Sequence, residues 1–297
     1  MSDKSIHTLV KDIYKVVGND KWFTPKLSEE FSREVGSRLV ESFGPRNQVP
    51  TLRLSQMGAR CPCALWHSIH SPMDAERLPP WARIKFGYGH ILEALVIAMA
   101  KAAGHEVTGE QDEITLDGVK GHRDCIIDGA IVDVKSCSSL QFEKYQSKSV
   151  AQDDSFGYLD QLDGYVVGSA MDPRVLVKDR GYILAIDKTL GKICLYEHIA
   201  REESIRERIR YFRSIIALDR PPKCTCETEA DGESGNVRLG VTASYNAFKF
   251  KCFPQLRTFL YAGGPRYLTK VVRRPMRRDR VTPIPEIDKD GNFVYNY

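Results

Sequence analysis

Gly121-His-Arg-Asp-Cys-Ile-Ile-Asp-Gly-Ala-Ile-Val-Asp-Val-Lys-Ser136 is the stretch that decides the fold. Asp128-Gly129 lies between two apolar runs, and Asp-Gly in that setting is a strong hairpin signal, because glycine adopts a positive φ without steric cost. We therefore predict one strand over 121–127, a turn at Asp128-Gly129, and a second strand over 130–136. Since side chains alternate along a strand, Asp133 and Lys135 are expected on one face, which Asp124 reaches from across the hairpin.

Two carboxylates and an ammonium group on one sheet face are costly to bury unless they hold a cation and a polyanionic substrate. Asp124 and Asp133 could supply oxygen ligands to Mg²⁺, and Lys135 could orient or deprotonate a water and stabilise developing negative charge. This pattern suits metal-assisted phosphodiester hydrolysis. The alternative is an ordinary turn followed by a solvated strand face with a surface ion pair, and an isolated Asp-x-Lys favours that alternative.

Further motifs lie on both sides of the hairpin. The spacing Asp124-x8-Asp133-x-Lys135 resembles the signature of the PD-(D/E)XK nucleases. Upstream, Gly89-His-Ile-Leu-Glu93 resembles the GHxxE motif of the RecB-like branch and is expected to open an apolar helix over 91–103. Downstream, Gln161-Leu-Asp-Gly-Tyr165 resembles the QxxxY motif of the same branch. The motifs follow one another in the family's order over residues 89–165.

The resemblance extends to the flanking segments 52–55 and 257–270, which are similar to phage-encoded exonucleases related to iron–sulfur-cluster nucleases. It implies a mixed α/β fold, a restriction-endonuclease-like αβββαβ core with extra N-terminal and C-terminal helices. It also implies that Glu93, Asp124 and Asp133 hold Mg²⁺ or Mn²⁺, with the backbone carbonyl of Val134 as a further ligand.

For the remaining motif residues, the resemblance implies that Lys135 acts on the water and on the transition-state charge. Gln161 and Tyr165, four residues apart on one helix face, would position Lys135 and the phosphate. His90 or His122 is expected near the metal, and a hydrogen-bonding strand residue is the alternative role for His122.

Three domains are expected along the chain: a helical region over 1–50 that serves as scaffolding on the core, a nuclease domain over 51–270, and a basic tail over 271–297. Helices are expected over 140–150, 156–169 and 199–218, a hairpin over 180–198, and a loop over 223–240. The basic tail either tracks DNA phosphates or is simply solvated. Its charge comes from a run that starts just ahead of it, Lys270, Arg273, Arg274, Arg277, Arg278 and Arg280.

The chain has eight cysteines, which in a cytoplasmic protein indicate metal binding, chemistry or inert burial more than disulfides. Cys61 resembles the upstream ligand of nucleases that hold a [4Fe–4S] cluster. The three downstream ligands of those relatives are spaced Cys-x2-Cys-x5-Cys, and the matching positions here are Ala243, Asn246 and Cys252. Because alanine and asparagine do not replace thiolates, this pattern counts against the cluster.

Other cysteines offer an alternative set of cluster ligands. Cys224-Thr-Cys226 could supply two thiolates beside Cys61 and Cys252, although Cys-x-Cys is a tight spacing for adjacent cluster ligands. Burial as small apolar residues is expected for Cys125, Cys137 and Cys194, which lie in or next to predicted strands.

Length and composition agree with a soluble enzyme, because 297 residues with 42% hydrophobic content can form a proper core. No apolar run approaches the ~20 residues of a membrane span. The N-terminus lacks a secretory pattern, so the expected location is the cytoplasm, that of the host cell for a phage protein.

The sequence therefore predicts a divalent-metal-dependent DNA exonuclease of phage DNA recombination or processing. DNA, bound without sequence specificity, and a single-strand annealing protein are its expected partners. Two alternatives stay open: a structure-specific endonuclease, and a non-catalytic DNA-binding recombination module of the same fold. The complete acid–acid–lysine set argues against the second of these.

Overall fold

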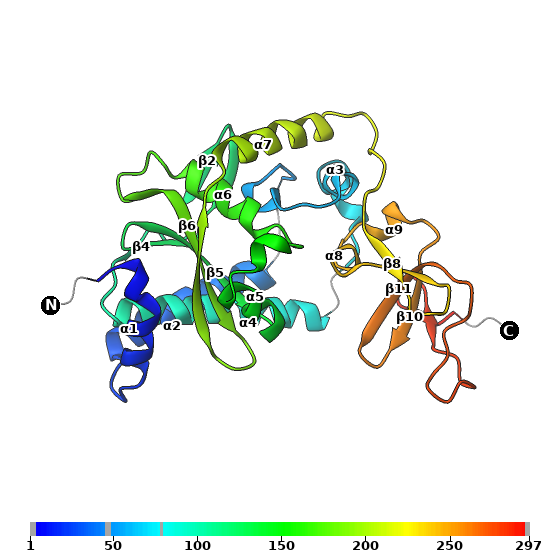
Figure 1. Ribbon diagram of the computed structural model, residues 1–297, viewed down its shortest axis with the longest axis horizontal. Helices are drawn as coiled ribbons and strands as arrows, with labels where there is room; N and C mark the ends of the chain where they lie inside the picture. The colour runs from blue at the N-terminus through cyan, green and yellow to red at the C-terminus, as the bar shows by residue number, and fades with distance from the viewer. Residues whose placement is uncertain (1–3, 45–48, 78–79, 295–297) are drawn as a thin grey trace. The chain divides into compact units, whose positions relative to one another are not determined.

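The computed structural model describes residues 4–44, 49–77 and 80–294. The chain divides into two compact units (Figure 1). The first unit takes Met1–Gly58 and Leu78–Arg210, and the second takes Ala59–Arg77 and Tyr211–Tyr297. The nuclease domain predicted over 51–270 includes parts of both units.

A mixed five-stranded sheet forms the centre of the first unit, in the order β1-β4-β5-β6-β7. Strands β5 and β6 are parallel, and the other neighbours are antiparallel. The parallel pair is connected through α5 (Ser139–Gln146) and α6 (Tyr158–Gly168). Together with α4 (Pro80–Ala102), this gives the predicted order αβββαβ in a mixed α/β fold. The strands are β1 (Val107–Thr108), β4 (Cys125–Ile127), β5 (Ala130–Cys137), β6 (Val177–Asp187) and β7 (Ile193–Ile199).

The central hairpin is confirmed at its turn. Asp128 and Gly129 both have positive φ, 49° and 76°, and Ile127 pairs with Ala130 on either side of them. The strand predicted over 121–127 is wrong at its centre. Residues 119–122 form β3 (Val119–His122), which pairs with β2 (Glu113–Leu116) in a separate two-stranded sheet.

Arg123 explains this break in the strand. Its side chain is only 1% exposed, and its Nη2 donates to Asp112 at 2.9 Å and to Asp172 at 2.5 Å. Its backbone N–H bonds to the carbonyl of Asp112. The buried guanidinium therefore fixes the chain where it leaves one sheet and enters the other.

Two N-terminal helices, α1 (Leu9–Val17) and α2 (Pro25–Phe43), pack on α4, as predicted for this region. Thr24 caps α2 by accepting a hydrogen bond from the N–H of Leu27, and Pro25 occupies the first helical position, where its missing donor costs nothing. Helix α4 begins at Pro80, so the motif over 89–93 lies within the helix. The prediction that this motif opens the helix is wrong.

The second unit contains an antiparallel five-stranded sheet in the order β12-β10-β11-β9-β8. The loop predicted over 223–240 is wrong in part, because it contains β8 (Thr228–Ala230) and β9 (Val237–Leu239). The other strands are β10 (Arg257–Tyr261), β11 (Gly264–Lys270) and β12 (Glu286–Ile287). The short helices are α3 (Pro62–His70), α8 (Val241–Ser244) and α9 (Lys249–Cys252).

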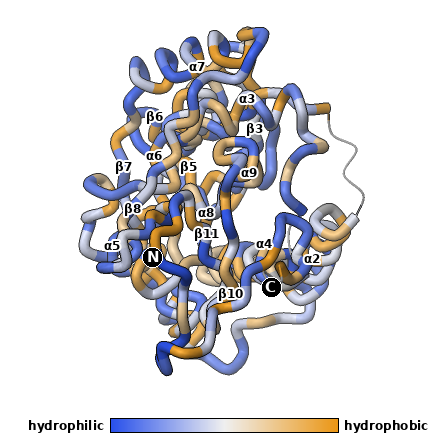
Figure 2. Tube along the Cα trace, turned by 90° about the vertical axis from the view of Figure 1, so that its right-hand side faces the viewer, coloured by the Kyte–Doolittle hydropathy of each residue, from blue (hydrophilic) through white to orange (hydrophobic). Residues whose placement is uncertain are grey.

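Helix α7 (Glu202–Ile216) contains the boundary between the units, and the helix predicted over 199–218 corresponds to it. Hydrophobic residues recur at intervals along α7 in Figure 2, and Ile205, Ile209 and Phe212 are buried. In the part of the chain that the structure describes, no helix has the length and apolar character needed to cross a membrane.

Candidate functional site

Asp133 and Lys135 lie in the middle of β5, next to the parallel strand β6. Asp133 is 1% exposed, and the Nζ atom of Lys135 lies 2.8 Å from its Oδ1. The two side chains therefore form an ion pair, in which Asp133 is buried and Lys135 is half-buried. Burial above all, with the charge of the neighbouring Asp124 adding to it and Lys135 opposing it, raises the pKa of Asp133 to about 7.

Asp124 lies between the end of β3 and the start of β4 and belongs to neither strand. Its Oδ2 accepts a hydrogen bond from the backbone N–H of Val134 at 2.8 Å. This bond holds the carboxylate over β5, beside Asp133. Val134 thus contributes its N–H to the site, while a metal-binding role for its carbonyl stays a prediction.

Glu93 reaches the site from the middle of α4. Its Oε1 accepts from Gln111 Nε2 at 3.0 Å and forms an ion pair with Arg38 Nη1. Burial raises the pKa of Glu93 to about 7, the charge of Asp124 adds to this effect, and Arg38 opposes it. Four residues earlier, a Cβ on Gly89 would lie 3.5 Å from Ser136 Oγ, so α4 passes close to β5 at this point.

Sequence reasoning missed Arg38, because the N-terminal helices were interpreted as scaffolding. Arg38 is 7% exposed on α2 and also donates through Nε to Glu34 at 2.6 Å. A signal was present in the sequence: Phe31, Val35 and Arg38 follow helical spacing, so an arginine occupies a position of the apolar stripe. A buried arginine on such a stripe indicates a buried acidic partner.

The side chain of Lys135 lies close to the ring of Tyr158. Its Nζ lies 5.4 Å from the centre of the Tyr158 ring. Burial by itself would lower the pKa of Lys135, but Asp133 and Asp124 outweigh it and raise the pKa above its usual value. Lys135 is therefore an ammonium group, which suits charge stabilisation and not proton abstraction.

Gln161 and Tyr165 are brought together on α6, where Gln161 Nε2 donates to Tyr165 Oη at 2.7 Å. Tyr165 is 3% exposed, and burial raises its pKa, with the charge of Asp133 adding to the effect. His122 is exposed on β3, opposite Glu113 of β2, and both of its expected roles stay predictions. His90 is half-buried in α4.

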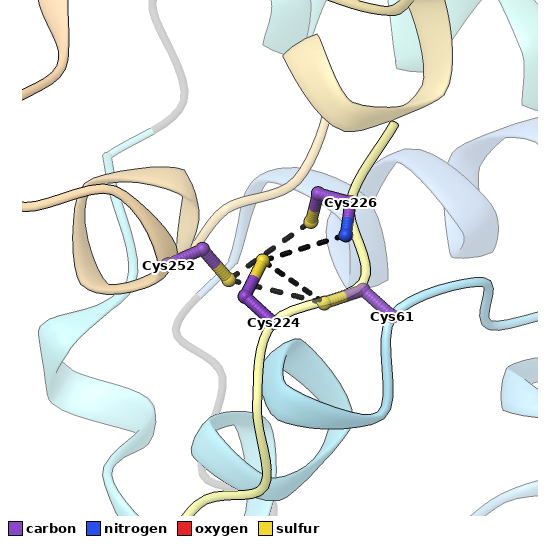
Figure 3. Close-up of side chains that lie close together, drawn as sticks. All are labelled: Cys61, Cys224, Cys226 and Cys252. Atoms are coloured by element: carbon purple, nitrogen blue, oxygen red, sulfur yellow. Dashed lines mark hydrogen bonds between the residues drawn. The ribbon is translucent and has the colours of Figure 1, made fainter. Parts of the chain in front are cut away.

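The second unit holds a different cluster, made of four cysteines. Cys61 precedes α3, Cys224 and Cys226 lie in the extended segment before β8, and Cys252 ends α9. Figure 3 shows their four sulfur atoms pointing toward one another. The Sγ atom of Cys61 lies 3.8 Å from those of Cys224 and Cys252, and the Sγ atoms of Cys226 and Cys252 are 3.9 Å apart.

These four thiols are the most compact set of potential metal ligands in the described ranges. All four Sγ atoms lie within 4.8 Å of one another, and within residues 4–44, 49–77 and 80–294 no other group of His, Cys, Asp or Glu is so close. Among the described residues, Glu93, Asp124 and Asp133 are not such a group. The pKa of Cys61 is held well below its usual range, because Cys226 and Cys252 donate to its sulfur.

The remaining cysteines behave largely as expected. Cys125 and Cys137 are buried in the central sheet, and Cys194 is half-buried on β7. Burial raises the pKa of Cys194 to about 11, so this thiol is not reactive.

No protein-family model matches the chain, and no curated protein matches it. Among solved structures, the chain is similar to the protein SSO0001, with 16% identity, 74% of this chain and 95% of the other covered, and a TM-score of 0.41. It is also similar to the alkaline exonuclease LHK-Exo from Laribacter hongkongensis, with 15% identity and a TM-score of 0.31. That match covers 64% of this chain and 91% of LHK-Exo. Both TM-scores are below 0.5, so neither likeness indicates a function for this chain.

Proposed function

We propose that the chain is a divalent-metal-dependent DNA exonuclease of the RecB-like branch of the PD-(D/E)XK nucleases, acting in phage DNA recombination or processing. The observation that carries the proposal is the ion pair of the buried Asp133 with Lys135, with Asp124 and Glu93 held beside it. A buried acid, two further carboxylates and a protonated lysine have little value as a structural element, because their burial is costly.

The charges of the site fit a divalent cation. Glu93, Asp124 and Asp133 face the cationic side chains of Arg38 and Lys135, so the five groups sum to −1 when all are ionised. Carboxylate oxygens are the ligands that Mg²⁺ and Mn²⁺ prefer. Glu93, Asp124 and Asp133 would hold the ion, with the carbonyl of Val134 as a further ligand. Once bound, such an ion neutralises charge on a scissile phosphate and favours ionisation of a water.

The other side chains would act on the substrate. The ammonium group of Lys135 supplies positive charge where negative charge develops in the transition state. Gln161 orients the hydroxyl of Tyr165 by donating to it, and this pair forms one wall beside Lys135. The backbone N–H of Val134 keeps Asp124 in place.

Contacts with DNA would come from the basic segment that follows β11. Residues 276–283 form a short antiparallel loop, closed by a bridge between Met276 and Pro283. The side chains of Arg277, Arg278 and Arg280 are exposed on it. Such a loop can bind phosphates without reading sequence. A single-strand annealing protein is the recombination partner that the proposal includes.

Degradation of end-labelled linear DNA and of closed circular DNA tests the proposal, with Mg²⁺, Mn²⁺ or a chelator. We expect metal-dependent loss of linear DNA alone, and reduction to the chelator background in Asp133→Asn. Asp179→Asn is the matched control, because Asp179 is exposed and pairs with Arg180, outside the site.

The order in which the 5′ and 3′ labels are released gives the polarity. Cleavage of closed circles would instead indicate the structure-specific endonuclease. DNA binding without cleavage under any metal would indicate the non-catalytic module, and full activity in Asp133→Asn would remove the site assignment.

A further inference from the structure

The spacing of the four sulfur atoms distinguishes between two kinds of metal centre. In a [4Fe–4S] cluster each thiolate binds a different iron, so the four thiolate sulfur atoms stand farther apart than they do around one metal ion. Four thiolates on one tetrahedral zinc ion, at about 2.3 Å each, stand about 3.8 Å apart. The sulfur–sulfur distances here are 3.8, 3.8 and 3.9 Å, and none of the six exceeds 4.8 Å. The thiols are too close together for the cluster that the resemblance implies.

We propose that Cys61, Cys224, Cys226 and Cys252 bind a single zinc ion in a structural site. A closed set of four thiolates with no position left for substrate is typical of structural zinc, and tetrahedral sulfur ligation selects zinc among the common divalent ions. The proposal concerns the second unit alone and does not depend on the nuclease activity.

Asn246 supports this assignment. It occupies a position where the resemblance places a cluster ligand, yet its Nδ2 donates to the sulfur of Cys226 at 3.3 Å and approaches that of Cys252 at 3.6 Å. The backbone N–H of Cys226 lies 3.4 Å from the sulfur of Cys224. N–H donors of this kind stabilise thiolates and orient metal ligands. Asn246 is thus a positioning residue beside the ion.

The buried apolar groups of the second unit are small. Among the described residues, Leu239, Ala243 and Leu256 form one group and Phe259, Leu268 and Ile284 another, while Leu65, Phe212 and Phe248 are buried as well. Small cores commonly depend on a metal or a disulfide for stability. The ion would join the segment that begins α3, the strand segment before β8 and the end of α9, which lie far apart in the sequence.

Metal analysis of protein from iron-replete cells, purified without oxygen, tests the proposal. Anaerobic purification is essential, because an iron cluster lost in air could be replaced by adventitious zinc. We expect about one zinc per chain and no acid-labile sulfide. Iron with acid-labile sulfide would overturn the proposal, as would metal-free protein or a disulfide among the four cysteines.

Variants separate these ligands from the other thiols. Cys226→Ser and Cys252→Ser should lose the zinc, whereas Cys194→Ser, in the first unit, should retain it. Retention of zinc by both ligand variants would overturn the proposal.

Two measurements do not depend on whether a ligand variant folds. Wild-type protein loaded with Co²⁺ should show thiolate-to-cobalt charge transfer and the absorption of a tetrahedral ion, and octahedral cobalt would contradict the proposal. Asn246→Ala keeps all four ligands and should bind zinc about 10–100-fold more weakly. An unchanged zinc affinity would remove Asn246 from the site.

Discussion

Replacing Arg38 with methionine should destabilise the first unit strongly. Arg38 is 7% exposed and pairs with Glu93, whose side chain is 14% exposed, so the substitution leaves a buried carboxylate without its cation. Breaking one side of a buried ion pair costs about 3–5 kcal/mol. Because Gln111 still donates to Glu93, we expect the lower end of this range, about 3 kcal/mol.

Urea denaturation at pH 8, followed by circular dichroism, measures this cost. Arg33→Met is the matched control: Arg33 lies on the same helix and pairs with Glu29 at 3.5 Å, but the two side chains are 75% and 77% exposed. An exposed pair of this kind contributes at most about 0.5 kcal/mol. A double-mutant cycle with Glu93→Gln should then recover most of the loss. Equal costs for Arg38→Met and Arg33→Met, or a coupling near zero, would refute the reasoning.

Three further outcomes are expected. Burial alone would raise the pKa of Asp163, but His198 and Arg201 lower it below the unfolded value of about 3.9. The ionised Asp163 therefore stabilises the folded state above that pH, and this stability is lost as the pH falls through the lower folded pKa. Asp163→Asn should therefore cost about 2 kcal/mol at pH 7 and much less at pH 2, by urea denaturation at each pH. Gly181→Ala should cost about 1–3 kcal/mol of folding stability in the same assay, because the new Cβ would lie 2.6 Å from Val166 Cγ2. By contrast, Gly36→Ala should stabilise the protein by about 0.5–1 kcal/mol, because Gly36 lies on the exposed face of α2 and a Cβ there would meet no atom within 4 Å. Replacing Arg277, Arg278 and Arg280 together with alanine should weaken DNA binding and reduce the steepness of log affinity against log salt concentration by about 2–3. Fluorescence anisotropy of labelled DNA measures both quantities, and an unchanged slope would exclude this loop from the DNA contact.

The parts of the fold that were predicted correctly depend on local chemistry. The turn at Asp128-Gly129 forms because these two residues tolerate positive φ. The break at Arg123 was not predictable in this way. It depends on Asp112 and Asp172, which are distant in sequence, and nothing in the apolar pattern of 121–127 indicates them.

Short strands with polar residues are a second limit of sequence reasoning. Strand β8 is exposed along its whole length, so it carries no apolar alternation to detect. It exists because its backbone pairs with β9, from Thr228 opposite Leu239 to Ala230 opposite Val237. Pairing of this kind is a property of the sheet as a whole and not of the strand's own composition.

The contacts of the candidate active site divide in the same way. Asp133 and Lys135 meet because they are two residues apart on one strand, and Asp124 reaches them through the register of the hairpin. Both relations can be read from the sequence. Arg38 and Gln111 come to Glu93 from α2 and from the segment between β1 and β2, and only the tertiary structure brings these elements together.

In the proposed zinc site, a shift in the position of two cysteines changes the metal while the number of ligands stays the same. The resemblance places three thiolates near α8 and α9, and here Ala243 and Asn246 take two of those places. Cys224 and Cys226 restore the count from an extended segment, where residues two apart project to the same side. Two thiolates that lie so close together suit a single metal ion better than two different irons of a [4Fe–4S] cluster. The spacing Cys-x-Cys, combined with the loss of Cys-x2-Cys, is therefore the sequence feature from which the change of metal could have been inferred.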